Sequence, residues 1–285
     1  MKDLPRLPSR KADSNKGDFG RGLLIGGSRG MAGAIAIAAM GALRGGAGLT
    51  TVAAADACLD TVAAHHPALM TLPLPSDRQG RIAVTATASL RRRLRQYDAA
   101  AIGPGMGQSL GLRKLIVELY RHVELPLIVD ADGLNALAKT PDWQSLAPAA
   151  PRILTPHPGE FQRLSGVDSH DRSSQVEAAR NMCKRKNLVI VLKGSQTAVI
   201  DRDRCRVNQT GNPKMAVGGS GDLLTGMILA MVCQQMSLFD AAVYAVHLHG
   251  LAGDLAARRL RCPSVLATDI LDDLPGAFET MEKSA

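Results

Sequence analysis

Short apolar runs alternate along this chain with segments of helical period. Runs of aliphatic residues bounded by glycine or polar residues predict strands, at 23–25, 49–53, 99–102, 127–129, 152–154 and 188–192. Segments of helical spacing follow most of these runs, beginning with the alanine-rich segment 32–44. Alternation of strand and helix predicts a mainly parallel sheet with helices on both faces and right-handed crossovers.

The pattern changes in the second half of the chain. Segments 197–201 and 204–208 predict a hairpin around Arg202 and Asp203, which adds an antiparallel part to the sheet. Helical spacing then dominates, in 222–235 and 240–260. No long linker interrupts residues 20–285, so we expect one domain there, preceded by a flexible N-terminal arm over residues 1–19.

Glycine-rich and polar motifs begin where predicted strands stop. They are Gly-Gly-Ser-Arg-Gly at 26–30, Gly-Pro-Gly-Met-Gly at 103–107, Asp-Ala-Asp-Gly at 130–133, Thr-Pro-His-Pro-Gly-Glu at 155–160 and Lys-Gly-Ser-Gln-Thr at 193–197. The carboxyl ends of parallel strands share one edge of a sheet, where open α/β sheets bind ligands. None of the motifs is specific alone, but together they predict one cleft.

The segment 208–222 carries the sharpest chemical signal. Gly218, Gly219 and Gly221 precede an amphipathic helix, so crowded backbone N–H groups and a helix N-terminus are suited to an oxyanion or phosphate. Asp222 stands at the same place. A helix-capping role for Ser220 or Asp222 is the simpler interpretation, but it leaves the three glycines unexplained. We favour Asp222 as a base in phosphoryl transfer.

Charge and composition narrow the class of ligand. The 285 residues carry 34 basic and 26 acidic side chains, a net charge of +8, yet only 3% are aromatic, which favours a small anionic ligand over nucleic acid. Five scattered cysteines without metal or redox spacing indicate a reducing compartment. The apolar stretch 31–43 is too short to span a bilayer. We therefore expect a cytoplasmic protein without membrane or nucleic-acid partners.

This chain resembles the NAD(P)H-hydrate dehydratase family in four segments, 208–226, 129–137, 155–160 and 17–21. The similarity runs from about residue 16 to 275. The resemblance implies a three-layer α/β/α, ribokinase-like fold and a carbon–oxygen lyase of nicotinamide nucleotide repair. Such enzymes convert the S epimer of hydrated NADH or NADPH to NADH or NADPH, by phosphorylation of the ring hydroxyl and elimination of phosphate. ADP, giving AMP and phosphate, is the expected co-substrate, with ATP left open. A homotetramer is also implied.

The resemblance also assigns residues. Asp222 is implied as the catalytic base, with the backbone of Gly219, Ser220 and Gly221 as the anion hole. The residues implied to contact the hydrated dinucleotide are Ala34, Gly105, His157 and Asp222. Those implied to hold the adenine nucleotide are Lys193, Gly194, Ser195, Gln196, Thr197 and Gly221. Related kinases need Mg²⁺, which Glu160 is expected to organise through water. The short segment before the first strand leaves no room for an epimerase domain, so a separate epimerase is the expected partner.

Some residues keep open interpretations. Lys214 stands where the family usually has glycine, so a positive φ there would be strained, and its charge is placed to approach the nucleotide. Asp130 and Asp132 are either turn residues or ligands. His247 and His249, two apart on a helix, point in different directions, so core packing or a subunit contact is favoured over a metal site. The arginines near 91–95 predict a solvated face.

Three rival functions remain. A nicotinamide-dependent dehydrogenase fits the first glycine-rich turn, but its glycine spacing is unusual and the next acidic residue, Asp56, comes about ten residues late. An ATP-dependent small-metabolite kinase, acting on a vitamin precursor alcohol, shares the fold class. The motifs at 155–160 and 208–213 argue against it. A nucleotide-sensing subunit is the non-catalytic alternative.

Overall fold

The computed structural model describes residues 4–185 and 187–283. Within them, nine strands form one sheet in the order β3-β2-β1-β4-β5-β6-β7-β8-β9. The strands are β1 (Arg21–Ile25), β2 (Leu49–Ala55), β3 (Met70–Leu74), β4 (Ala99–Ile102), β5 (Leu127–Val129), β6 (Arg152–Leu154), β7 (Leu188–Leu192), β8 (Ala198–Ile200) and β9 (Cys205–Val207). All pairings from β3 to β7 are parallel, and those of β8 and β9 are antiparallel. The predicted sheet is therefore confirmed.

One strand, β3, is absent from the sequence prediction. It contains Pro73 and buries only two of its five residues. Proline cannot donate to a sheet ladder, and it is tolerated here because β3 is the edge strand, paired only with β2. A half-exposed edge strand lacks the continuous apolar run that marks the buried strands of a parallel sheet.

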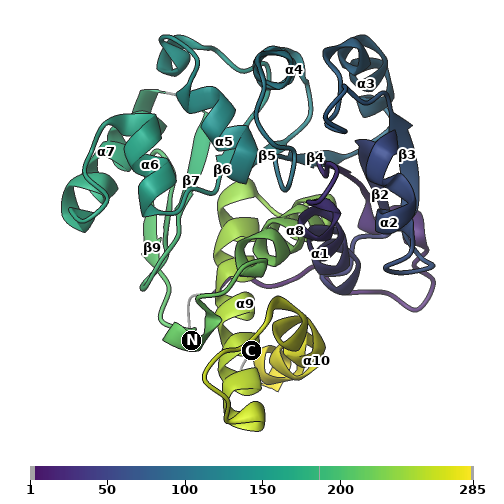
Figure 1. The fold of residues 1–285 in the computed structure, drawn as a ribbon. Helices are drawn as coiled ribbons and strands as arrows, with labels where there is room; N and C mark the ends of the chain where they lie inside the picture. Colours follow the sequence, from purple (N-terminus) through teal and green to yellow (C-terminus); the bar gives the residue numbers. More distant parts are fainter. Residues whose placement is uncertain (1–3, 186, 284–285) are drawn as a thin grey trace.

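The described residues form ten α-helices, most of which cover the two faces of the sheet, while α10 packs on α9 (Figure 1). They are α1 (Ala32–Arg44), α2 (Leu59–Ala63), α3 (Thr87–Leu94), α4 (Leu110–His122), α5 (Ala131–Ala138), α6 (Pro158–Ser165), α7 (Arg172–Arg185), α8 (Ser220–Cys233), α9 (Leu238–Leu260) and α10 (Ala267–Lys283). Helices α1, α2, α8, α9 and α10 contact one another in one layer, and α3 to α7 form the other layer. This is the expected three-layer α/β/α arrangement.

The contact between α1 and α8 fixes the position of the α8 N-terminus. The two helices lie side by side near the centre of Figure 1. Glycines make this close approach possible, because a methyl group on Gly226 would overlap the carbonyl oxygen of Ala38, and one on Gly41 would overlap that of Leu223. Backbone therefore packs on backbone, and α8 has no room to slide along α1.

The segment before β1 contacts the domain where it is described. Arg10 donates from Nη2 to the carbonyl oxygen of Gly46 at 2.7 Å and stacks over the Phe19 ring at 3.7 Å. Leu4 and Leu7 pack against the core. Residues 1–3 lie outside the described residues, and the flexibility of the arm stays a prediction.

Candidate active site

A cleft of about 830 Å³ opens at the carboxyl edge of the sheet. Its lining comes from the ends of β5 and β7, from the loop 208–216, and from α8 and α9. Asp130, His157, Lys193 and Asp222 all line it, although they lie far apart in the sequence. The prediction that five motifs at the strand ends converge on one cleft is confirmed for those at 130–133, 155–160 and 193–197, and is wrong for those at 26–30 and 103–107, which do not line it.

The N-terminus of α8 supplies free backbone donors to this cleft. The helix begins at Ser220, directly after Gly219, which adopts the left-handed conformation with φ 91°. The N–H groups of a first helical turn have no partner within the helix, and the helix dipole places partial positive charge there. No side chain caps this end, so the capping interpretation of Ser220 and Asp222 is wrong. The end of α8 is available to an anion.

Asp222 lies in that first turn with a perturbed acidity. Burial, together with the negative charges of Asp130 and Glu160 and against the opposing charge of Lys193, raises the pKa of its carboxyl to about 7. The side chain is therefore close to half protonated at neutral pH. A carboxylate with a pKa near the working pH is suited to accept a proton during catalysis.

Lys193 is held in the site by a buried carboxylate. Its Nζ lies 2.8 Å from Oδ1 of Asp130, which is 1% exposed, and 3.9 Å from Oε2 of Glu160. Thr225 on α8 donates to Oδ2 of Asp130 at 2.7 Å. Burial would raise the pKa of Asp130, but Lys193 and these hydrogen bonds lower it overall. Asp130 is therefore a charged counter-ion in the cleft, not a simple turn residue.

His157 and Glu160 begin α6 as a reciprocal cap. Nδ1 of His157 accepts from the Gly159 N–H at 3.1 Å, and Oε2 of Glu160 accepts from the His157 N–H at 2.8 Å. Burial and the positive charge of Lys193 lower the pKa of His157, so its imidazole is neutral at pH 7. Burial raises the pKa of Glu160, against an opposing contribution from Lys193.

The carboxylates of the cleft do not form a preformed metal cage. In 4–185 and 187–283, no three histidine, cysteine, aspartate or glutamate side chains are grouped to hold a metal ion. Magnesium usually keeps several waters and binds one or two carboxylates together with substrate phosphates. Glu160 is 5% exposed, its Oε2 lies 3.9 Å from the amine of Lys193, and it does not line the cleft, so its role toward Mg²⁺ stays a prediction.

Ala34 and Gly105 come together beside α8. A methyl group on Gly105 would lie 3.1 Å from Cβ of Ala34, and Ser28 donates to the Gly105 carbonyl oxygen at 2.8 Å. Ile37, one turn further along α1, reaches Gly219. Neither Ala34 nor Gly105 lines the cleft of Lys193. Of the residues assigned to the hydrated dinucleotide, Ala34 and Gly105 therefore lie outside this cleft, whereas His157 and Asp222 line it.

Asp132 supports the loop that carries Gly105. Its Oδ2 accepts from the Gly107 N–H at 2.8 Å, and its Oδ1 accepts from Nε2 of Gln108 at 3.0 Å. Asp132 thus fixes the loop 103–108 from the first turn of α5. Asp132 therefore has a structural role, close to the turn interpretation, whereas Asp130 lines the cleft and pairs with Lys193.

His249 belongs to the cleft, which the sequence did not indicate. It is 8% exposed, it lines the cleft, and its Nε2 lies 3.3 Å from Oγ of Ser220. Burial lowers its pKa to about 4, so the imidazole is neutral. His247 instead lines a separate hollow beside β9, which confirms that the two histidines point in different directions. This contact joins two different helices, α8 and α9, so the periodicity within either helix could not predict it.

Lys214 causes no backbone strain. It lies in the 3-10 turn Pro213–Met215, and it is absent from the described non-glycine residues with positive φ. Its carbonyl oxygen accepts from the Val265 N–H at 2.9 Å. Lys214 does not line the cleft, so the suggested approach of its charge to a nucleotide receives no support.

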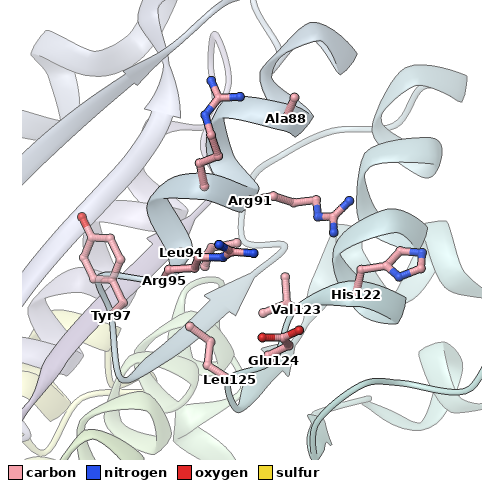
Figure 2. Close-up of a pocket in the computed structure, with 10 residues that line it drawn as sticks. Ala88, Arg91, Leu94, Arg95, Tyr97, His122, Val123, Glu124 and Leu125 are labelled. Atoms are coloured by element: carbon pink, nitrogen blue, oxygen red, sulfur yellow. The ribbon is translucent and has the colours of Figure 1, made fainter.

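The arginines of α3 surround a second hollow, of about 520 Å³, at the opposite edge of the sheet (Figure 2). They are exposed, which confirms the predicted solvated face. Arg91 pairs with Glu118 at 2.7 Å. Beneath the hollow, the buried guanidinium of Arg152 donates to carbonyl oxygens that include Tyr120 and Val123, at the end of α4. Cations are favourable at helix C-termini, so the ends of α3 and α4 account for this basic cluster.

Comparison with known proteins agrees with this geometry. A family model described as NAD(P)H-hydrate dehydratase matches residues 22–276. The bifunctional NAD(P)H-hydrate repair enzyme Nnr of Moorella thermoacetica is 39% identical over 280 residues, which cover 98% of this chain and 53% of that protein. This chain spans about half the length of the curated relatives it matches.

Two solved structures show the same fold. The ADP/ATP-dependent NAD(P)H-hydrate dehydratase of Bacillus subtilis, co-crystallised with ATP and Mg²⁺, has a TM-score of 0.80 and 33% identity, covering 96% of this chain and 94% of that one. A ribokinase-like superfamily protein of Enterococcus faecalis has a TM-score of 0.82 and 28% identity, covering 96% and 92%. The fold is therefore ribokinase-like, as expected.

Proposed function

Because the chain belongs to the NAD(P)H-hydrate dehydratase family, we propose that it restores NADH and NADPH from their hydrated forms at the expense of ADP or ATP. The observation that carries the proposal is Asp222. It combines a pKa of about 7 with a place in the first turn of α8, beside unpaired backbone donors. A base and an anion-binding helix end at one point are what transfer of a phosphoryl group to a hydroxyl requires.

Asp222 acts as the base in the proposed reaction. Its carboxylate accepts the proton of the ring hydroxyl as the oxygen attacks the terminal phosphorus of the nucleotide, and the bond from that phosphorus to the bridging oxygen breaks, which releases AMP from ADP or ADP from ATP. The N–H groups of Gly219, Ser220 and Gly221 stabilise the developing charge. The phosphorylated ring then loses phosphate, which is a far better leaving group than hydroxide, and the dihydronicotinamide is restored.

The adenine nucleotide is assigned to the side of the cleft that contains Lys193. A methyl group on Gly221 would lie 3.2 Å from Nζ of Lys193, so a cation and a helix end meet there. The segment 193–197 lines the same cleft. Lys193, held by Asp130, supplies positive charge to the phosphates. We assign Lys193, Gly194, Ser195, Gln196, Thr197 and Gly221 to the nucleotide on this basis.

The hydrated dinucleotide is assigned to Ala34, Gly105, His157 and Asp222. Ala34 and Gly105 meet outside the cleft of Lys193, whereas His157, with a neutral imidazole, and Asp222 line that cleft. The ring hydroxyl and the terminal phosphate would meet at Asp222, which lines the cleft together with Lys193 and Gly221. This arrangement converts an encounter of two ligands into a step within one complex.

Further parts of the proposal concern cofactor and assembly. Magnesium, held through Glu160 and water, would neutralise negative charge on the nucleotide phosphates when bound. We also propose that the protein forms a homotetramer, is located in the cytoplasm and works with a separate epimerase. The curated relatives are named bifunctional, and this chain matches about half of their length. No described helix combines the length and apolar character that a bilayer-spanning segment requires.

The proposal is tested by restoring NADH absorbance from hydrated NADH with purified protein, Mg²⁺, and either ADP or ATP. We expect restoration, with AMP and phosphate formed from ADP. Folded protein that restores no NADH with either nucleotide contradicts the proposal. Stable phosphorylation of a thiazole or pyrimidine alcohol would support a metabolite kinase instead. Nucleotide binding without turnover of hydrated NADH or NADPH would indicate a sensor.

The rate of dehydration should depend on pH through Asp222. The base must be deprotonated, and its pKa is raised to about 7. We therefore expect kcat/KM to rise with pH up to about 7 and to level off above it. Phosphate release, measured between about pH 5.5 and 8.5, avoids reliance on the absorbance of NADH. A profile that is flat over this interval would show that Asp222 does not titrate as described.

A further inference from the structure

One wall of the nucleotide cleft is a loop that rests on a single face of α9. The loop residues 208–213, together with Met215 and Ala216, line the cleft. Beneath the loop lie His247, Gly250 and Asp254, spaced three and four residues apart and hence on one side of the helix, together with Gly253, which is next to Asp254. We call these four residues the α9 seat. The seat determines where the cleft wall stands.

Hydrogen bonds fasten the loop to the seat at three successive residues. Thr210 donates from Oγ1 to the carbonyl oxygen of His247 at 2.8 Å. The Gly211 N–H donates to Oδ2 of Asp254 at 2.9 Å, and Nδ2 of Asn212 donates to Oδ1 of Asp254 at 2.8 Å. Both oxygens of Asp254 are thus used by the loop. No ion pair to Asp254 occurs within 4–185 and 187–283.

The two glycines of the seat allow the loop to approach closely. A methyl group on Gly250 would overlap the Thr210 hydroxyl and lie 2.7 Å from the Thr210 backbone carbonyl. One on Gly253 would overlap the sulfur of Met215. Glycine within a helix is normally unfavourable compared with alanine. Here two glycines within four residues are accounted for by the contact with the loop.

The same helix reaches the anion-binding end of α8. His249, between His247 and Gly250, lies 3.3 Å from the Ser220 hydroxyl. Helix α9 therefore contacts both the loop wall and the first turn of α8, and all three line the cleft. A shift of the loop relative to α9 would change the shape of the cleft without moving Asp222.

We propose that Asp254 and Gly250 are positioning residues for the adenine nucleotide, acting through the loop 208–216. They set nucleotide affinity, whereas the proton transfer at Asp222 does not depend on them. This inference rests on the proposed function, which identifies the ligand of the cleft as an adenine nucleotide. It adds residues of α9 to the determinants of nucleotide binding.

Two variants test the seat. Asp254→Asn places an amide N–H group against the donors of Gly211 or Asn212, and Gly250→Ala pushes the loop away from the helix. For each we expect the Kd for ADP, measured by calorimetry, and the KM for ADP to rise about tenfold. We expect kcat and the KM for hydrated NADH to change less than about threefold. Gly276→Ala on α10, whose methyl group would make only an ordinary contact of 3.5 Å with Leu255, is the matched control.

The proposal is decided by whether the two variants change only the Kd and KM for ADP or change kcat and both KM values together. A general loss of structure would lower the thermal midpoint and affect kcat and both KM values together, which would overturn the proposal, as would unchanged ADP affinity in both variants. The calorimetric Kd requires no turnover. If the wild-type protein binds ADP but does not dehydrate hydrated NADH, the proposed function fails while the role of the seat is still measured.

Discussion

Replacing Asp222 by asparagine is expected to lower the rate of dehydration roughly a thousandfold. Asparagine keeps the shape of the side chain but does not accept the proton of the ring hydroxyl. The backbone donors at the start of α8 and the Lys193–Asp130 pair are unchanged by the substitution. ADP should therefore bind with wild-type affinity or somewhat more tightly, because a negative charge near its phosphates has been removed.

The same variant should unfold at a higher temperature than the wild type. The pKa of Asp222 is raised from 3.8 to about 7 in the folded protein, mainly by burial. A raised carboxyl pKa means that the wild type loses stability as the pH rises from about 4 to 7. The asparagine variant avoids this loss, so its advantage should be small near pH 4.5 and reach the order of a few kcal/mol above pH 7.

Thermal unfolding of both proteins at several pH values measures this difference. An advantage of the variant that is independent of pH would contradict the raised pKa. Wild-type turnover by a folded Asp222→Asn protein would remove Asp222 from the mechanism. The two results are independent, since one concerns the charge of the carboxyl group and the other its use as a base.

Replacing Gly226 by alanine is expected to destabilise the fold by at least about 3 kcal/mol, enough in a typical domain to reduce the yield of folded protein sharply. The added methyl group would overlap the carbonyl oxygen of Ala38 and lie 2.7 Å from its carbon. Both helices would have to separate, because the contact is with backbone and no side chain can rotate away. Urea unfolding, followed by circular dichroism, gives the free energy.

Gly33→Ala on α1 is the matched control. A methyl group there meets no atom within 4 Å, and the residue has no positive φ. The substitution should leave the free energy of unfolding unchanged or raise it by up to about 1 kcal/mol, through helix propensity alone. If Gly226→Ala were as harmless as Gly33→Ala, the helices would not be in the close contact described.

The sheet was predictable because its strands are buried on both faces. Five residues of β7 and four of β4 are all buried, and such runs of aliphatic residues are distinctive in a sequence. The edge strand β3 was not predictable, since Pro73 and its half-exposed residues resemble a loop. The start of α8 was placed two residues late, because Ser220 and Gly221 have weak helix propensity and only tertiary contacts hold them.

The sequence predicted the motifs that reach the site, but not which side chains pair with one another there. The ends of β5, β6 and β7 and the glycine-rich start of α8 all reach the cleft as predicted. The ion pair between Asp130 and Lys193 joins residues 63 positions apart, so local pattern contains no sign of it. The same holds for Thr225 and His249, which read in the sequence as ordinary residues of apolar helices.

The glycine contact between α1 and α8 has a consequence for how the protein is made. A ribosome that adds roughly 5–20 residues per second releases α1 many seconds before α8 is synthesised. Until then, the face of α1 that includes Ala38, Gly41 and Ala42 has no partner from α8. We therefore expect the nascent chain to remain dependent on chaperones until α8 has emerged, and fragments that end before Gly226 to aggregate.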